Sequence, residues 1–140
     1  MQITANFSYY ELECPCCEQL EIDYRFIQAL QEIRDAIGRP IKITSGFRCH
    51  KHNMEVGGAI TSNHLKGRAV DISTRGWSSE DLHYLVYELT SKQHPDFQTG
   101  VGIYKNHIHF DFRESDDSLW VNLCKCMSVS IRVRTAAYVF

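Results

Sequence analysis

The sequence predicts a single α+β domain. Its 140 residues, of which 44% are hydrophobic and 23% charged, have the composition of one ordinary globular domain. Two segments, 23–38 and 79–92, carry apolar residues at helical spacing, and the stretches between and after them alternate apolar and polar residues over short runs. No internal repeat, low-complexity run or linker interrupts the chain. We therefore expect one domain over residues 1–140.

Two helices are expected. In the first, over 23–38, Asp23 is suited to the N-cap and Gly38 follows the last apolar position. Its apolar stripe consists of Phe26, Ile27, Leu30, Ile33 and Ile37. The second, over 79–92, begins at two serines that can cap it. Its stripe consists of Leu82, Leu85, Val86 and Leu89. Each helix should bury its stripe against the sheet.

The strands are expected where apolar and polar residues alternate. Segments 41–44 and 69–73 have this pattern, and 101–104 leads through a short turn into 107–112, which suggests a hairpin. The tail alternates again over 129–134, and we interpret it as a weaker edge strand.

Charge and hydropathy exclude several classes of partner. The chain has 15 Lys and Arg against 17 Asp and Glu, a formal charge of −2 without blocks of one sign, so we expect no nucleic-acid partner. No stretch approaches the roughly 20 apolar residues of a membrane helix. Residues 1–14 lack the basic and apolar regions of a signal peptide, so we expect cytoplasmic synthesis without an export signal. We also expect a monomer.

The spacing of cysteines and a histidine suggests a structural zinc site. Cys14 and Cys17, and likewise Cys49 and His52, are three positions apart, as in the two halves of a zinc knuckle. A structural zinc there is one interpretation. The alternatives are that these cysteines are small buried residues, or that Cys14 or Cys17 pairs with Cys49 on oxidation.

The segment 107–112 holds the most informative pattern. Because a strand sends successive side chains to opposite faces, His107, His109 and Asp111 should share one face while the apolar residues between them enter the core. Three groups in register that can bind a proton or a metal favour a site. The alternative is a half-exposed strand with a polar outer face.

A second candidate pair is His64 and Asp71. Asp71 lies within an apolar strand, where an ionised carboxylate needs a partner, and a cation shared with His64 would supply it. Alternatively, Asp71 points outward and meets Arg68 or solvent. With one histidine of the pair His107 and His109, these residues form the ligand set of a catalytic zinc. The same set describes the facial triad of a non-haem iron oxygenase.

Three motifs follow one another in order along the chain. They are SGFR at 45–48, SNHLKGRAVD at 62–71 and HIHFD at 107–111. Together they resemble the zinc D-alanyl-D-alanine carboxypeptidases and the related phage L-alanyl-D-glutamate endopeptidases, which share the hedgehog/DD-peptidase fold. The likeness covers about residues 7–113, includes CPCC at 14–17, and is strongest to a small single-domain branch common in phages and prophages. It implies a small antiparallel sheet with helices packed on one side, and leaves 114–140 unassigned.

The resemblance also implies roles for individual residues. His64, Asp71 and His109 match the zinc ligands of the family. Arg48 matches the arginine that polarises the scissile carbonyl or holds a substrate carboxylate, although it could instead form a surface salt bridge. Ser62 is implied in substrate binding.

The general base departs from the pattern of several relatives. These carry an acidic residue three positions before the last zinc histidine, where this chain has Asn106, and an amide cannot take up a proton. We therefore expect His107 to be catalytic. The alternatives are a carboxylate such as Asp111 or Glu114, or an enzyme of low activity.

The function expected from this resemblance is a zinc-dependent peptidoglycan peptidase that hydrolyses an amide bond in stem or cross-bridge peptides. Its context would be phage lysis or wall remodelling, and a holin or secretion apparatus would bring it to the cell wall or periplasm. The alternatives are a catalytically weak zinc-containing binding domain of the hedgehog type, or an iron oxygenase. The cleaved bond depends on pocket shape, which the sequence does not reveal.

Overall fold

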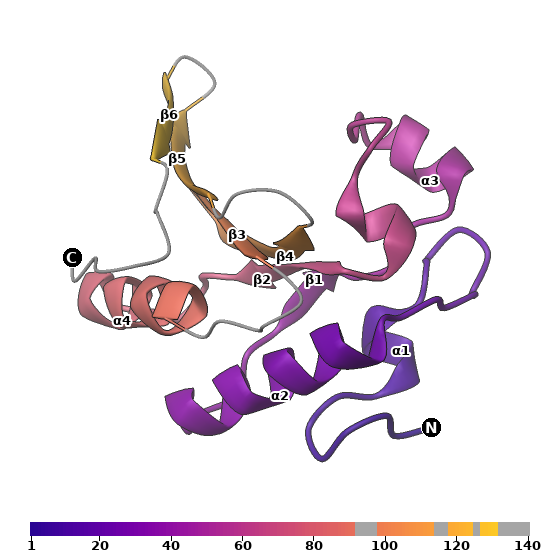
Figure 1. The fold of residues 1–140 in the computed structure, drawn as a ribbon, viewed down its shortest axis with the longest axis horizontal. Coiled ribbons are helices and arrows are strands. Elements are labelled where there is room, and N and C mark those ends of the chain that lie inside the picture. Colours follow the sequence, from indigo (N-terminus) through magenta and orange to yellow (C-terminus); the bar gives the residue numbers. More distant parts are fainter. Residues whose placement is uncertain (92–97, 114–117, 125–126, 132–140) are drawn as a thin grey trace.

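The computed structural model describes residues 1–91, 98–113, 118–124 and 127–131 (Figure 1). Its helical elements are α1 (Tyr9–Leu12), α2 (Tyr24–Ile37), α3 (His50–Glu55), the 3-10 helix η1 (Asn63–Lys66) and α4 (Ser79–Ser91). Its strands are β1 (Ile43–Ser45), β2 (Ala69–Ser73), β3 (Gln98–Tyr104), β4 (His107–Arg113), β5 (Ser118–Cys124) and β6 (Met127–Ile131).

The strands form one sheet in the order β1-β2-β4-β3-β5-β6. The first four pair antiparallel, β3 and β4 as the predicted hairpin, whereas β5 runs parallel to β3. β6 pairs with β5 at the outer end of this order and overlaps the edge strand expected over 129–134. Residues 132–134 lie outside the described residues, as does Glu114.

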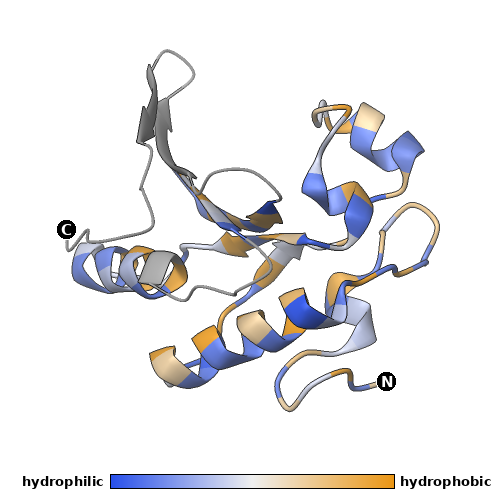
Figure 2. Cartoon of the chain, in the orientation of Figure 1, coloured by the Kyte–Doolittle hydropathy of each residue, from blue (hydrophilic) through white to orange (hydrophobic). Residues whose placement is uncertain are grey.

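One face of the sheet packs against α2 and α4, and this contact forms the core (Figure 1). On β4, Ile108, Phe110 and Phe112 are fully buried, and Phe26 of α2 lies with its ring centroid 5.3 Å from each of the two phenylalanine rings. Figure 2 shows hydrophobic and hydrophilic residues interspersed along α2 and the central strands, as expected for elements buried on one side. The predicted α+β fold is confirmed, with the two long helices on one side of the sheet and antiparallel pairing among its first four strands.

The predicted ends of the first helix match α2. The Asp23 side chain accepts a hydrogen bond from the backbone N–H of Arg25 at 2.9 Å, and Gly38 takes the left-handed conformation at φ 72° that ends helices. The short helices α3 and η1 were not expected, because six and four residues are too few to show helical periodicity. They lie on the opposite side of the sheet from α2 and α4 (Figure 1).

A glycine holds η1 in place beside the sheet. Gly67 ends η1 with φ 65°, and a Cβ at this position would lie 2.2 Å from the carbonyl oxygen of Glu21. The position therefore requires glycine for both its conformation and its close backbone approach. The following residue, Arg68, pairs through Nε with Asp23 Oδ2 at 3.0 Å, so Asp23 joins the start of α2 to the start of β2.

Among the helices in the described part of the chain, none is long and apolar enough to cross a membrane.

Candidate metal centre

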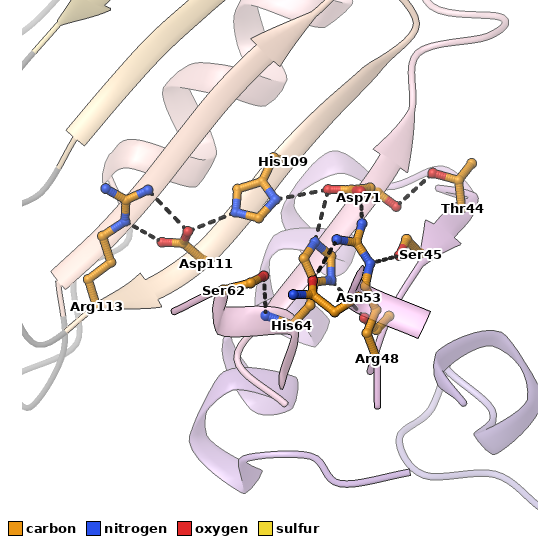
Figure 3. A network of polar contacts seen from close by, with 11 residues as sticks. Thr44, Ser45, Arg48, Asn53, Ser62, His64, Asp71, His109, Asp111 and Arg113 are labelled. Atoms are coloured by element: carbon orange, nitrogen blue, oxygen red, sulfur yellow. Dashed lines mark hydrogen bonds and ion pairs between the residues drawn. The ribbon is translucent and has the colours of Figure 1, made fainter. Parts of the chain in front are cut away.

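Three predicted ligands converge on the polar face of the sheet (Figure 3). His64 comes from η1, Asp71 from β2 and His109 from β4, and one donor atom of each lies within 4.8 Å of the others. Asp71 Oδ1 is 3.3 Å from His64 Nε2 and 2.9 Å from His109 Nδ1. Two imidazole nitrogens and one carboxylate oxygen therefore share a space in which they could hold one metal ion.

Strand register and a capped turn produce this convergence. In the antiparallel β2–β4 pair, Asp71 is directly opposite His109, so the two side chains project from adjacent strands on the same face. The Ser62 hydroxyl oxygen accepts a hydrogen bond from the backbone N–H of His64 at 3.3 Å and caps η1. His64 Nδ1 donates to the carbonyl oxygen of Gly46 at 2.7 Å. This bond sets the tautomer and leaves Nε2 free to bind a metal.

His109 is held from its other side by a buried carboxylate. Its Nε2 donates to Asp111 Oδ2 at 2.7 Å, while Arg113 Nε donates to Asp111 Oδ1 at 2.8 Å. Burial lowers the pKa of His109, but the hydrogen bonds with Asp111 and Asp71 outweigh it and raise the pKa to about 9. Of the two ring protons, the Nδ1 proton faces the site and is the one that a metal would replace.

Asp111 and Arg113 form a support that our sequence analysis did not identify. The sequence placed Asp111 on the polar face beside His109 and kept it as an alternative base, but it did not pair Asp111 with Arg113. Asp111 is 2% exposed, and its oxygens are bonded to His109 and Arg113. Gly100, on the neighbouring strand, makes room for the pair, since a Cβ there would lie 2.4 Å from both Asp111 Oδ1 and Arg113 Nε. The signal was present in the strand period, which places Arg113 two residues beyond Asp111 on the same face.

Arg48 contacts the site through its ion pair with Asp71. Its Nη2 donates to Asp71 Oδ2 at 3.1 Å, its Nε to Ser45 Oγ at 3.0 Å and its Nη1 to Asn53 Oδ1 at 3.5 Å. Asp71 thus meets Arg48 and both histidines, whereas Arg68, the alternative partner, pairs with Asp23. Burial raises the pKa of Asp71, but hydrogen bonds from the two histidines outweigh it and hold the pKa well below its usual range.

Asn53 is a further residue that sequence analysis missed. It is buried in α3, and its Nδ2 donates to the carbonyl oxygen of Ala59 at 2.9 Å while its Oδ1 accepts from Arg48. Gly58 packs so close that a Cβ there would lie 2.0 Å from Asn53 Oδ1. Asn53 therefore ties the loop after α3 to the arginine of the site.

His107 lies on the same face of β4 as His109, one pleat away. Its ring stacks on Tyr104, with centroids 4.5 Å apart and planes 6° from parallel. Burial lowers its pKa and outweighs the opposing effect of the Asp71 carboxylate, and the charges of His109 and Arg48 lower the pKa further. His107 is therefore neutral at pH 7 and can accept a proton.

A cavity of about 850 Å³ opens over these residues. Its walls include the three candidate ligands as well as Arg48, Ser62 and His107. Four basic side chains, namely Arg48, Lys66, Arg68 and Arg113, also line it. The cavity is large enough for a short peptide and suited to groups that carry negative charge.

A second group of side chains that could hold a metal ion lies apart from this cavity. The sulfur atoms of Cys14, Cys17 and Cys49 lie within 4.8 Å of one another. His52, the fourth predicted ligand, is not among them, and its Nδ1 lies 3.9 Å from Glu55 Oε2.

The Cys14 thiol has a lowered pKa. Burial raises its pKa, but backbone N–H groups of Cys49, Cys16 and Cys17 that donate to its sulfur outweigh this effect and bring the pKa from 9.0 to about 7.

Residues 5–111 match the family described as Peptidase M15. The match covers well over half of the chain, so the chain belongs to this family of zinc metallopeptidases, as the resemblance of its motifs predicted. A search of curated proteins finds no match. The donor set of His64, Asp71 and His109 fits zinc, because neutral imidazole and carboxylate are among the ligands that zinc prefers and the cavity leaves a further position open.

Proposed function

We propose that this protein is a zinc-dependent peptidoglycan peptidase that hydrolyses an amide bond in the stem or cross-bridge peptides of the cell wall. The observation that carries the proposal is the convergence of His64, Asp71 and His109 on a cavity of about 850 Å³. Each histidine uses its outer nitrogen to donate to an oxygen, Gly46 O or Asp111 Oδ2. The inner nitrogens are thereby aimed at the carboxylate of Asp71.

In the proposed mechanism, His64, Asp71 and His109 would hold one zinc through the nitrogen and oxygen atoms that converge at the site. When bound, zinc supplies a Lewis acid that polarises the scissile carbonyl and makes a coordinated water acidic near pH 7. The bond from His109 Nε2 to Asp111 keeps the ring oriented and makes Nδ1 a better donor.

Arg48 is proposed to bind the substrate. A guanidinium has five N–H donors, and three of them meet Asp71, Ser45 and Asn53. Within the described part of the chain the other two donors have no partner; Arg48 lines the cavity, so they can meet a carbonyl oxygen or a carboxylate of the peptide. The contact with Asp71 places these donors next to the carbonyl that would be attacked, where they stabilise developing negative charge.

His107 is proposed as the general base. It lines the cavity, is neutral at pH 7, and shares a strand face with His109. Asp111 is a poorer candidate, since its oxygens are engaged with His109 and Arg113 and it is buried. A proton taken by the His107 ring could later be given to the leaving amine.

Ser62 is proposed as a substrate-binding residue in addition to its capping role. Its oxygen accepts from the backbone N–H of His64, so its own O–H proton is available to an acceptor in the cavity.

The basic lining supports a substrate that carries free carboxylates, as the stem peptides of peptidoglycan do. We infer a lytic or wall-remodelling role for a monomer that is synthesised in the cytoplasm and reaches the wall through a holin or a secretion apparatus. The cofactor is one catalytic zinc.

The test is to incubate the zinc-loaded protein with purified peptidoglycan and to identify the products by mass spectrometry. New termini at one defined peptide bond, with one zinc per chain lost in the His64→Ala and His109→Ala variants, are the expected result. Because Asn106 replaces an acidic residue, a binding domain of the hedgehog type is the second candidate. Tight zinc and muropeptide binding without new termini would favour that candidate and overturn the peptidase.

A further inference from the structure

The CPCC loop and the N-terminus of α3 bring three thiols together, those of Cys14, Cys17 and Cys49, with Cys16 next to Cys17 in the chain. Cys14 is fully buried, Cys49 is half-buried, and Cys16 and Cys17 are exposed. Cys49 is the N-cap of α3 and lies 35 positions after Cys14, yet the two sulfur atoms are 3.7 Å apart. The fold therefore joins two distant segments at their cysteines.

The sulfur positions match a tetrahedral metal site. Zinc–sulfur bonds of about 2.3 Å in a tetrahedron place the sulfur atoms about 3.8 Å apart. The Cys14–Cys49 separation of 3.7 Å equals such an edge, and Cys17 Sγ lies within 4.8 Å of both. A disulfide would require about 2.05 Å, so the arrangement is far closer to the metal geometry.

Backbone N–H groups are aimed at the sulfur atoms. The N–H of Cys49 donates to Cys14 Sγ at 3.5 Å, and the N–H of His52 donates to Cys49 Sγ at 3.4 Å. Such bonds stabilise thiolates and orient them as ligands. His52 thus contributes to the cluster through its backbone, while its ring lies toward Glu55.

The loop is closed independently of any metal. Cys14 N donates to Gln19 O and Glu18 N to Cys14 O, both at 2.8 Å. Glu18 adopts φ 59°, a left-handed conformation that non-glycine residues rarely take, so the surrounding contacts hold the loop in a defined shape. This shape keeps Cys14 and Cys17 on the side of Cys49.

We propose that Cys14, Cys17 and Cys49, with Cys16 as the fourth ligand, form a second metal site that binds zinc or a similar thiophilic divalent cation. Cys16 is assigned the fourth position because it is adjacent to Cys17 in the CPCC loop and is exposed, so its side chain can turn toward the ion. Four thiolates complete the closed tetrahedral shell of a structural zinc.

The site would anchor the segment that carries Arg48. Phe47 N donates to Leu12 O at 2.8 Å, and a Cβ on Gly46 would lie 2.5 Å from that same oxygen, so the segment packs closely on the end of α1. A metal shared by Cys14 and Cys49 would lock this contact one residue from Arg48. Such a metal would stabilise the N-terminal region and would leave the candidate metal ligands of the cavity unchanged.

Cobalt(II) distinguishes this site from the candidate catalytic centre. Thiolate–cobalt charge transfer absorbs strongly in the near ultraviolet, whereas His64, Asp71 and His109 contain no sulfur. The full-length protein is stripped with a chelator, kept reduced with a phosphine and titrated with Co²⁺, then with Zn²⁺. The candidate catalytic centre can also take up cobalt, so the charge-transfer band is expected to saturate within two equivalents in the wild type and at one equivalent in His109→Ala. The band should disappear when zinc displaces cobalt and should accompany a rise in Tm.

Variants identify the ligands. Cys17→Ser, at an exposed position that should not impair folding, is expected to lower metal affinity more than about 100-fold, beyond the loss typical of removing a neighbour of a ligand. Cys49→Ser and Cys16→Ser should also weaken the band, whereas the matched control His52→Ala should keep it. The same band in His109→Ala would show that the site is independent of the catalytic metal and of peptidase activity.

Two results would overturn the proposal, and a third would overturn its fourth ligand. The first is wild-type protein that binds cobalt without a thiolate band under reducing conditions. The second is a Cys14–Cys49 disulfide, detected by mass spectrometry, that forms even with metal in excess. The third, a band lost in His52→Ala but kept in Cys16→Ser, would overturn the assignment of the fourth ligand.

Discussion

Replacing Asp111 by asparagine tests how the proposed metal ligand His109 is held. The carboxylate accepts from His109 Nε2 at 2.7 Å and from Arg113 Nε and Nη2 at 2.8 and 3.2 Å. An asparagine has one carbonyl oxygen and an NH₂ group, so at least one of these donors will face another donor in a residue that is 2% exposed.

The magnitude follows from these contacts. A buried polar group left without a partner costs about 1–3 kcal/mol, so we expect Asp111→Asn to lower the free energy of unfolding of the metal-free protein by this amount. Loss of the carboxylate behind a ligating histidine typically weakens metal binding about 10- to 100-fold. This range corresponds to about 1.4–2.8 kcal/mol of zinc-binding free energy.

Zinc affinity is measured by competition with a chromophoric chelator, and stability by urea denaturation of the metal-free protein. The matched control is Asp81→Asn, which removes a carboxylate from an arginine pair with Arg39 at 3.1 Å on the surface, away from the site. Asp81→Asn should lower the free energy of unfolding by less than about 1 kcal/mol and leave zinc affinity unchanged. Unaltered zinc affinity in Asp111→Asn would refute the view that Asp111 supports a metal ligand.

Three further predictions address other residues. His107→Ala should keep its zinc and its Tm while turnover falls about 10²-fold or more, with the exposed His83→Ala as control; full activity would remove His107 as the base. Arg48→Lys should lose about 1.5–3 kcal/mol in catalytic efficiency at unchanged zinc content, because the charge remains but the planar fork does not, and unchanged kinetics would exclude Arg48 from substrate binding. Burial raises the pKa of Asp23, but bonds from Arg25 and Arg68 outweigh it and lower the pKa below its ordinary 3.8. The Asp23 carboxylate therefore stabilises the fold above about pH 4, and this contribution disappears as the pH falls through the lowered pKa. The control variant is Asp23→Asn, which keeps an N-cap side chain but removes the charge. The free energy of unfolding of the wild type should exceed that of the variant at pH 7, and this difference should shrink as the pH is lowered to 3. A difference that stays constant would contradict the ion-pair role.

Local patterns in the sequence predicted much of the scaffold. The period of two residues on β4 correctly placed His107, His109 and Asp111 on one face and the phenylalanines in the core. The cap and terminal glycine of α2 were also correct, because such signals depend on backbone conformation within one or two turns. The pairing of β5 parallel to β3 was not predicted, since a parallel pairing follows from a long connection and not from any local motif.

The sequence alone identified the candidate metal ligands, namely His64, Asp71, His109 and the cysteines of CPCC. Only the tertiary structure decided which atoms face one another. It turns Asp111 from a candidate base into the buried partner of His109, and it places Cys49 against Cys14 while the ring of His52 lies elsewhere. The physical reason is the sequence separation involved. Periodicity is set by residues a few positions apart, whereas ligand geometry depends on strand register and on packing between segments tens of residues apart.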